Sequence, residues 1–331
     1  MKYIFPFFFL FLFYQNIAAQ NGKLIARQPL DIFLRKESFG QNKKLAGRIS
    51  FEKNGERFFK PKYTYLDSVE IEQITYLSDG LKVKGYLAFP KYKKQIPCVI
   101  YNRGGNREFG SLNEYKAVFI LARVASWGYV VAASQYRGNG GGEGREEFGG
   151  SDVNDVLNLV PLLSNIPQAD TSRMALYGWS RGGMMTYLAL TRSCRFKAAI
   201  VGGGLSDLWA FMETRQDTIE TVFANNIPGY AMNTKAVLNA RSAIKQVGKI
   251  CKTTPILMLH GTADWRVVPE MALDLSKAFL KEKVPHRLVL FEGGDHGLRE
   301  FNDEVNSMAK NWLDKYVKNK APLPVLKMHG K

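Results

Sequence analysis

Short apolar segments alternate with longer amphipathic segments from about residue 69 to residue 317, and this alternation constrains the fold more than any other feature. The short segments have the length and flanking glycines of buried strands, whereas the long ones carry apolar residues at helical spacing. Such a chain is expected to form an α/β fold, a mostly parallel central sheet with helices on both faces. We predict strands at residues 69–77, 81–89, 98–101, 129–136, 174–178, 198–201, 256–260 and 288–291. We predict helices at residues 111–127, 152–163, 181–193, 268–282 and 301–317.

Residues 205–250 interrupt the alternation after the sixth expected strand. This segment has a helix-rich pattern and carries the aromatic residues Trp209, Phe211, Phe223 and Tyr230. An insertion at this point would lie over the carboxyl edge of the sheet, where open α/β sheets bind ligands. We therefore expect a helical insertion here, which either contacts the substrate or only packs on the domain.

The first residues of the chain do not resemble the rest of the fold. Lys2 precedes an apolar run at residues 3–14, and small residues follow the run up to Ala19. This order is typical of a secretory signal peptide, and the run is shorter than the ~20 residues that a membrane span needs. We expect cleavage near Ala19 and export to the periplasm or the medium, with an uncleaved N-terminal anchor as the alternative.

Charge and metal-ligand residues narrow the classes of partner. The formal net charge is +16, but the lysines and arginines are scattered and form no block of like charge. This pattern favours a solvated basic surface over a nucleic-acid or membrane partner. The chain has only four histidines and three cysteines, without a C-x-x-C or H-E-x-x-H motif, so we expect neither a metal nor another cofactor.

The three cysteines differ in their sequence context. Cys98 lies inside an apolar strand and is expected to be an inert core thiol. Cys194 and Cys251 each precede a predicted strand, and these two strands should be neighbours in the sheet. Both thiols would then lie at the same edge, so a disulfide between them is predicted if their Cα atoms are within ~7 Å.

The pentapeptide GWSRG at residues 178–182 matches the G-x-S-x-G motif. It follows one predicted strand directly and begins the next predicted helix, which is the setting of a nucleophile elbow. The sharp turn would lift the hydroxyl of Ser180 above the sheet edge. We predict that Ser180 is a catalytic nucleophile; the alternative is a helix cap without catalysis.

A serine nucleophile needs a base, and the base needs an acid that orients it. Asp264 and His296 each follow a predicted strand, and they occur in the order Ser, Asp, His that is typical of this motif. The carboxyl ends of parallel strands meet at one edge, so Ser180, Asp264 and His296 are predicted to form a catalytic triad. Asp207 is the alternative acid, and His260 is expected to be structural.

An oxyanion hole requires two hydrogen-bond donors near the nucleophile. The backbone N–H of Arg181 follows Ser180 directly and is the first candidate. The second is the backbone N–H of Gly104, in the loop NRGGN at residues 102–106 after a predicted strand. A plain glycine turn is the alternative interpretation of this loop.

The motifs together resemble the prolyl oligopeptidase family of serine peptidases, in its α/β-hydrolase catalytic domain. The resemblance rests on the hairpin at 78–80, YRG at 136–138 with its glycine-rich continuation to 148, GWSRGG at 178–183, HGTAD at 260–264 with VVP at 267–269, and GDHG at 294–297. The resemblance implies an α/β-hydrolase fold and the same triad of Ser180, Asp264 and His296.

Some features depart from this family. Relatives commonly carry a β-propeller, whose blades take ~40–45 residues each, and residues 20–66 could hold one blade at most. Arg103 stands where relatives have His or Tyr, which leaves open whether its side chain takes part in catalysis. Arg181 replaces an aromatic residue that is frequent in the elbow. We divide the chain into a signal peptide at 1–19, an N-terminal extension of unclear structure at 20–66, the α/β-hydrolase catalytic domain at 67–320 and a basic tail at 321–331.

The sequence favours an exported serine hydrolase that cleaves short peptides through an acyl-enzyme. The alternative is a carboxylic ester hydrolase, acting on acyl or glycan esters with the same fold and triad. We expect a small peptide or ester substrate, no nucleic acid and no stable membrane insertion. The sequence does not predict the oligomeric state.

Overall fold

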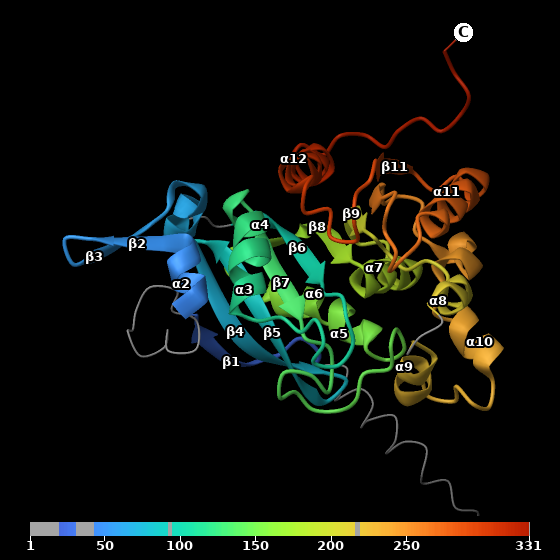
Figure 1. Cartoon of the computed structure of the whole chain (residues 1–331), viewed down its shortest axis with the longest axis horizontal. Helices are drawn as coiled ribbons and strands as arrows, with labels where there is room; N and C mark the ends of the chain where they lie inside the picture. Colours follow the sequence, from blue (N-terminus) through green and yellow to red (C-terminus); the bar gives the residue numbers. More distant parts are fainter. Residues whose placement is uncertain (1–19, 31–42, 92–94, 216–218, 331) are drawn as a thin grey trace, which may run out of the picture.

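The central sheet has nine strands, in the order β1-β4-β5-β7-β6-β8-β9-β10-β11 (Figure 1). The computed structural model describes residues 20–30, 43–91, 95–215 and 219–330. Pairing is antiparallel from β1 to β7 and parallel from β7 to β11. The expected mostly parallel sheet is thus confirmed. The strands are β1 (Leu24–Pro29), β4 (Val69–Ser78), β5 (Leu81–Pro90), β6 (Ile96–Asn102), β7 (Val130–Ser134), β8 (Ala169–Trp179), β9 (Phe196–Gly202), β10 (Ile256–Gly261) and β11 (His286–Phe291).

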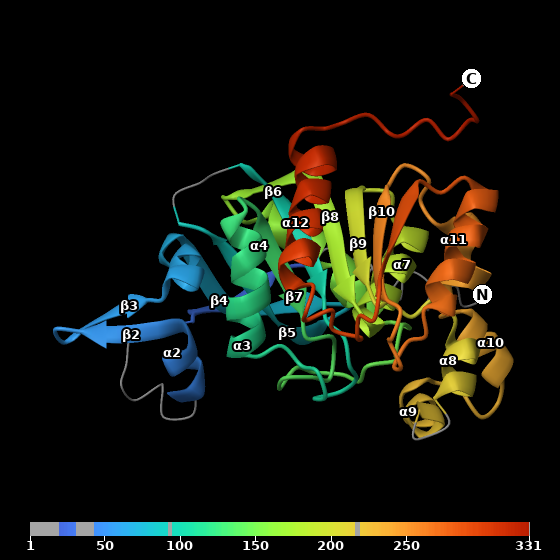
Figure 2. The same cartoon turned by 45° about the horizontal axis from the view of Figure 1, so that its top comes forward.

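Helices cover both faces of the sheet, and each face has its own apolar core. On one face, apolar residues of α4 (Ala122–Ser126) and α12 (Asn302–Leu313) pack against the strands (Figure 2). On the other face, the second core contains residues of the helical insertion after β9 and of four other α-helices. These four helices are α5 (Val153–Leu157), α6 (Leu159–Ser164), α7 (Arg181–Arg192) and α11 (Glu270–Glu282).

The helices expected at 111–127 and 152–163 differ in detail from the structure. The helix expected at 111–127 begins at α3 (Glu114–Lys116), and a π-helical turn (Ala117–Leu121) joins it to α4. The helix expected at 152–163 is divided at Asn158 into α5 and α6. The Asn158 amide donates to Ser78 Oγ at 2.9 Å, so this break attaches the helix pair to the β4-β5 hairpin.

A helical segment follows β9, the sixth of the predicted strands, as expected. It contains α8 (Leu208–Thr214), α9 (Ile219–Asn226) and α10 (Thr234–Asn239). Phe223 packs against Phe211 and Tyr230 of this segment and also against Phe148 from the glycine-rich loop. These ring contacts attach the insertion to the body of the domain.

The N-terminal extension contributes directly to the sheet, because β1 is its edge strand and pairs with β4. The remainder forms α2 (Lys43–Ile49), the hairpin of β2 (Ser50–Lys53) and β3 (Glu56–Phe59), and a 3-10 helix (Pro61–Ser68). Asn54 and Gly55 both have positive φ, as a two-residue hairpin turn between β2 and β3 requires. The hairpin projects sideways from the sheet (Figure 1).

The signal peptide predicted at 1–19 lies outside the described residues. Within the part that the structure does describe, no helix combines the length and the apolar character that crossing a bilayer requires.

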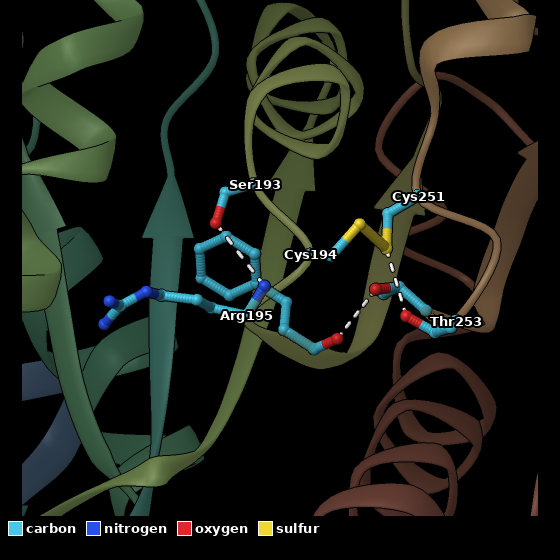
Figure 3. Close-up of a disulfide and its surroundings, with 7 residues drawn as sticks. Ser193, Cys194, Arg195, Cys251 and Thr253 are labelled. Carbon is cyan, nitrogen blue, oxygen red and sulfur yellow. Dashed lines mark hydrogen bonds between the residues drawn. A yellow bond between two sulfur atoms is a disulfide. The ribbon is translucent and has the colours of Figure 1, made fainter.

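A disulfide between Cys194 and Cys251 joins the segments that precede β9 and β10 (Figure 3). Their Cα atoms are 5.3 Å apart, so the predicted pairing is confirmed. Nearby, Thr254 Oγ1 donates to the carbonyl oxygen of Phe196 at 2.7 Å, a second link between the same two strands. Cys98 is a buried free thiol, and burial raises its pKa to about 12, consistent with an inert core residue.

Candidate active site

Ser180 occupies a sharp turn between β8 and α7. Its φ of 60° lies in the left-handed region, which non-glycine residues seldom adopt outside functional turns. A Cβ atom at Gly178 would lie 2.0 Å from the Gly182 carbonyl oxygen, and one at Gly182 would lie 1.9 Å from that of Asn102. Both glycines are therefore required by close backbone contacts, and together they present Ser180 at the carboxyl edge of the sheet.

Asp264 and His296 are directly paired at the same edge. The distance between Asp264 Oδ2 and His296 Nδ1 is 2.7 Å, and the Asp264 side chain is buried. Backbone N–H groups of Arg266 and Val267 donate to the other carboxylate oxygen, at 2.9 and 3.0 Å. Burial acts to raise the pKa of Asp264, but hydrogen bonds from His260, His296 and Val267 outweigh it and hold the pKa well below its usual range. Asp264 is therefore a carboxylate that can orient the imidazole.

Ser180 and His296 line one cavity, and both lie close to the Gly202-Gly203 segment. The Ser180 N–H donates to the Gly202 carbonyl at 2.8 Å, and a Cβ at Gly203 would lie 3.2 Å from the His296 ring. The Trp179 indole donates to the His296 carbonyl at 2.8 Å and holds that loop against the elbow. No hydrogen bond joins the Ser180 and His296 side chains among the described contacts; in ligand-free hydrolases this bond is often long.

The alternative acid and base lie elsewhere or have other partners. Asp207 caps α8 by accepting from the Trp209 N–H at 2.9 Å, and it lines a different cavity from Ser180. His260 is buried, with its Nε2 2.7 Å from the Val267 carbonyl and 3.4 Å from Asp264 Oδ2. The structure therefore brings Asp264 to His296, whereas Asp207 is not part of this cluster.

Gly104 lies against the elbow. A Cβ atom at Gly104 would be 2.9 Å from the Trp179 carbonyl oxygen and 3.1 Å from Ser180 Cβ, so a larger residue would not fit. Neither the Gly104 N–H nor the Arg181 N–H has an acceptor within the described part of the chain. Both donors are therefore available to a substrate oxygen next to Ser180.

A buried ion cluster behind the elbow was not predicted from the sequence. The Arg181 side chain is 2% exposed, and it donates to Glu146 Oε2 at 2.9 Å and to Asp152 Oδ2 at 2.6 Å. Its guanidinium also lies over the rings of Tyr136 and Phe148, with its Cζ 5.1 and 4.6 Å from their centroids. The acidic residues in and after the glycine-rich segment were the available sequence signal for these partners.

The same cluster holds the loop that carries Gly104. Arg181 donates to the Gly105 carbonyl at 3.0 Å, and Glu146 Oε1 accepts from the Arg107 N–H at 2.8 Å. Arg103 donates to the carbonyls of Gly104 at 3.2 Å and of Arg107 at 3.0 Å, and its side chain does not line the cavity. Burial and the neighbouring Arg181 lower the pKa of Arg103 to about 10. Arg103 thus contacts the loop backbone rather than the space in front of Ser180.

The cavity at Ser180 has a volume of about 750 Å³ and extends in two directions. One part reaches the insertion, with the apolar residues Phe148, Leu205, Phe211, Ile219 and Val222. The other part runs between α4 and α12. The helical insertion therefore lines the site, and none of the described lining residues is acidic.

The described residues contain no group of three or more His, Cys, Asp or Glu side chains arranged to hold a metal ion.

Comparisons with known proteins relate this site to a group of peptidases. The sequence pattern of the prolyl oligopeptidase family matches residues 115–320. The uncharacterized peptidase YtmA of Bacillus subtilis is 36% identical over 200 residues, which are 60% of this chain and 75% of that protein. Dipeptidyl-peptidase 5 of Porphyromonas gingivalis is 28% identical over 242 residues, which are 70% of this chain and 35% of that protein.

Solved structures show the same fold. Acylaminoacyl peptidase of Pyrococcus horikoshii has a TM-score of 0.64 at 23% identity, over 80% of this chain and 46% of that one. A puromycin-hydrolyzing peptidase of Mycobacterium tuberculosis has a TM-score of 0.61 at 21% identity, over 76% of this chain and 46% of that one. The chain thus spans three quarters of YtmA but less than half of these longer relatives.

Proposed function

Because the chain belongs to the prolyl oligopeptidase family and is a serine peptidase, we propose that it cleaves short peptides through an acyl-enzyme on Ser180. The observation that carries this proposal is the Asp264–His296 pair, because His296 lines the same cavity as Ser180. Similar proteins reported above are peptidases, so the ester-hydrolase alternative is not favoured.

In the proposed mechanism, Ser180 Oγ attacks the scissile carbonyl carbon while His296 Nε2 takes its proton. Asp264 accepts from His296 Nδ1, which fixes the ring tautomer and stabilises the imidazolium that forms. The N–H groups of Gly104 and Arg181 stabilise the negative charge on the carbonyl oxygen. His296 then protonates the leaving amine, and a water molecule hydrolyses the acyl-enzyme by the same sequence of proton transfers.

Turnover of two substrate panels tests this function. One panel contains aminoacyl and dipeptidyl amides, the other contains acetyl and feruloyl esters of sugars, and the Ser180→Ala protein is the blank. We expect Ser180-dependent amide turnover at a kcat/KM comparable to that of the esters. Ester turnover without amide turnover would contradict the peptidase proposal.

Export to an oxidising compartment is part of the proposal. Its support is the signal-like composition of residues 1–19 and the Cys194–Cys251 disulfide, because disulfides persist mainly in exported proteins. The test is N-terminal sequencing of the protein from cell fractions. An exported form that begins just after Ala19 is expected, and a cytosolic form that retains Met1 would contradict export.

A further inference from the structure

The part of the cavity between α4 and α12 has a floor of two tyrosines. Figure 2 shows these helices beside each other over the same face of the sheet. Below them, Tyr101 of β6 and Tyr177 of β8 are opposite each other in the strand register, with ring centroids 5.7 Å apart. Both side chains line the cavity, although each residue is only 6% exposed.

Neither phenol hydroxyl has a hydrogen-bond partner among the described residues, in contrast to the buried Tyr76 and Tyr136, whose hydroxyls both donate. Neither oxygen is among the fully buried atoms of the described residues that lack a partner, so both hydroxyls reach the cavity, where they can donate to a bound acceptor. Burial raises the pKa of both Tyr101 and Tyr177 above its usual range, so both phenols stay protonated and act as donors.

The two tyrosines share their cavity with positive side chains. Lys116, Arg123 and Arg299 line the same cavity, and none of them forms an ion pair with a described carboxylate. Lys116 donates to the carbonyls of Gly110 and Ser111, and Arg123 lies over the Tyr65 ring. No described acidic residue lines the cavity, so the positive charge of these three side chains is not neutralised there and can attract an anionic group.

The position of His296 indicates which part of the substrate lies between α4 and α12. His296 protonates the leaving amine, so the leaving peptide lies on its side of Ser180. The loop after His296 passes through Arg299 directly into α12, one of the two helices that flank the tyrosine floor. The part at the insertion, where Arg215 and Arg266 line the cavity beside apolar side chains, remains for the acyl portion of the substrate.

We propose that the space between α4 and α12 binds a carboxylate on the leaving side of the peptide substrate. The phenols of Tyr101 and Tyr177 donate to this carboxylate, and Arg299, Lys116 and Arg123 supply the positive charge. The inference rests on the proposed peptidase function. The carboxylate is either the C-terminal α-carboxylate or an aspartate or glutamate side chain.

Matched peptides with one N-acetylated apolar acyl portion test the proposal. The first pair has leaving dipeptides that end in a free carboxylate or a carboxamide. The second pair has amidated ends and differs only in a glutamate or glutamine. Charge-assisted hydrogen bonds predict a kcat/KM about ten- to a hundredfold higher for the anionic member. A preference in the first pair identifies the α-carboxylate, and one in the second identifies the side chain; the absence of both overturns the proposal.

Substitutions then test whether the preference for the anionic peptide depends on the residues between α4 and α12. Tyr101→Phe combined with Tyr177→Phe removes the hydroxyls and keeps the rings, and Arg299→Gln removes one charge. Each change should reduce the ratio of anionic to neutral turnover at least severalfold. Arg195→Gln is the matched control, because Arg195 is exposed at the opposite edge of the sheet, beside the disulfide (Figure 3). An unchanged ratio in both the tyrosine and arginine variants would contradict the assigned site.

Binding to the Ser180→Ala protein separates this proposal from the peptidase function. Calorimetry compares an N-acetylated dipeptide carboxylate, and an amidated one carrying glutamate, with their neutral counterparts. Tighter binding of an anionic peptide, lost in the tyrosine double variant, supports the subsite even if the wild-type protein cleaves no peptide. Equal affinities overturn it even if peptides are cleaved.

Discussion

The two edges of the parallel sheet are built in different ways. At the carboxyl edge, Ser180 has positive φ and Asp264 is a buried carboxylate beside His296. At the amino edge, a disulfide joins Cys194 to Cys251. The carboxyl edge thus concentrates backbone strain and buried charge, whereas the amino edge is held by a covalent link.

This difference indicates that the reaction chemistry is confined to one edge of the sheet, whereas contacts that stabilise the fold lie at both. Strained residues and buried charges cost free energy and persist where the surrounding structure supports them. The strands and helices that carry these residues, such as β8, α7 and β10, supply that support. Changes at the carboxyl edge should therefore lower turnover, whereas changes at the amino edge should leave turnover unchanged and alter only the free energy of unfolding.

The largest expected effect is the loss of turnover in His296→Ala. Removal of the base should lower kcat by about 10⁴–10⁶-fold, because the hydroxyl of Ser180 is then a poor nucleophile. Peptide hydrolysis kinetics measure this loss, and the melting temperature is expected to change little. Activity close to wild type would contradict the assignment of His296.

The second comparison is between two carboxylates. Asp264→Asn should lower kcat by about 10⁴-fold, because the amide favours the wrong tautomer of His296. Asp207→Asn should leave kcat within a few-fold of wild type, since Asp207 caps α8 outside this cluster. A larger loss in Asp207→Asn than in Asp264→Asn would show that the acid is misassigned.

Glu146→Gln should lower both kcat and the free energy of unfolding, because it weakens the buried ion pair between Glu146 and Arg181. Breaking a buried ion pair costs about 3–5 kcal/mol, so denaturant unfolding should show a loss approaching this range. The kcat should also fall, because Glu146 holds the backbone of Arg107 in the Gly104 loop.

The matched control is Glu282→Gln, whose exposed partner Lys252 lies 3.4 Å away at the amino edge. Exposed pairs contribute less than about 1 kcal/mol, so its stability should stay near that of the wild type. Equal losses in Glu146→Gln and Glu282→Gln would remove the distinction between the two edges.

The smallest expected effect on turnover comes from the disulfide. Replacing Cys194 and Cys251 by Ser should lower the free energy of unfolding by about 2–4 kcal/mol, because the unfolded chain regains freedom. Thermal and denaturant melts measure this loss, and kcat/KM at 25 °C should remain within twofold of wild type. A large fall in kcat/KM of the folded variant would show that the edges are coupled.

Features that depend on nearby residues could be predicted from the sequence. The elbow at Ser180 and the hairpin turn at Asn54 follow from backbone sterics within a few residues, and alternation along the chain predicts the sheet. The break at Asn158 was missed, because its amide bonds to Ser78, 80 residues earlier in the chain. The pattern of apolar residues alone does not contain that contact.

Local strand, turn and helix signals were enough to identify the fold class, the family and the candidate residues Ser180, Asp264 and His296. Three-dimensional packing brings Arg181 to Glu146 and places Tyr101 and Tyr177 at the cavity wall beneath two helices. These contacts join residues that lie far apart along the chain. Burial and charge pairing depend on which remote segments pack together, and no short-range pattern records that packing.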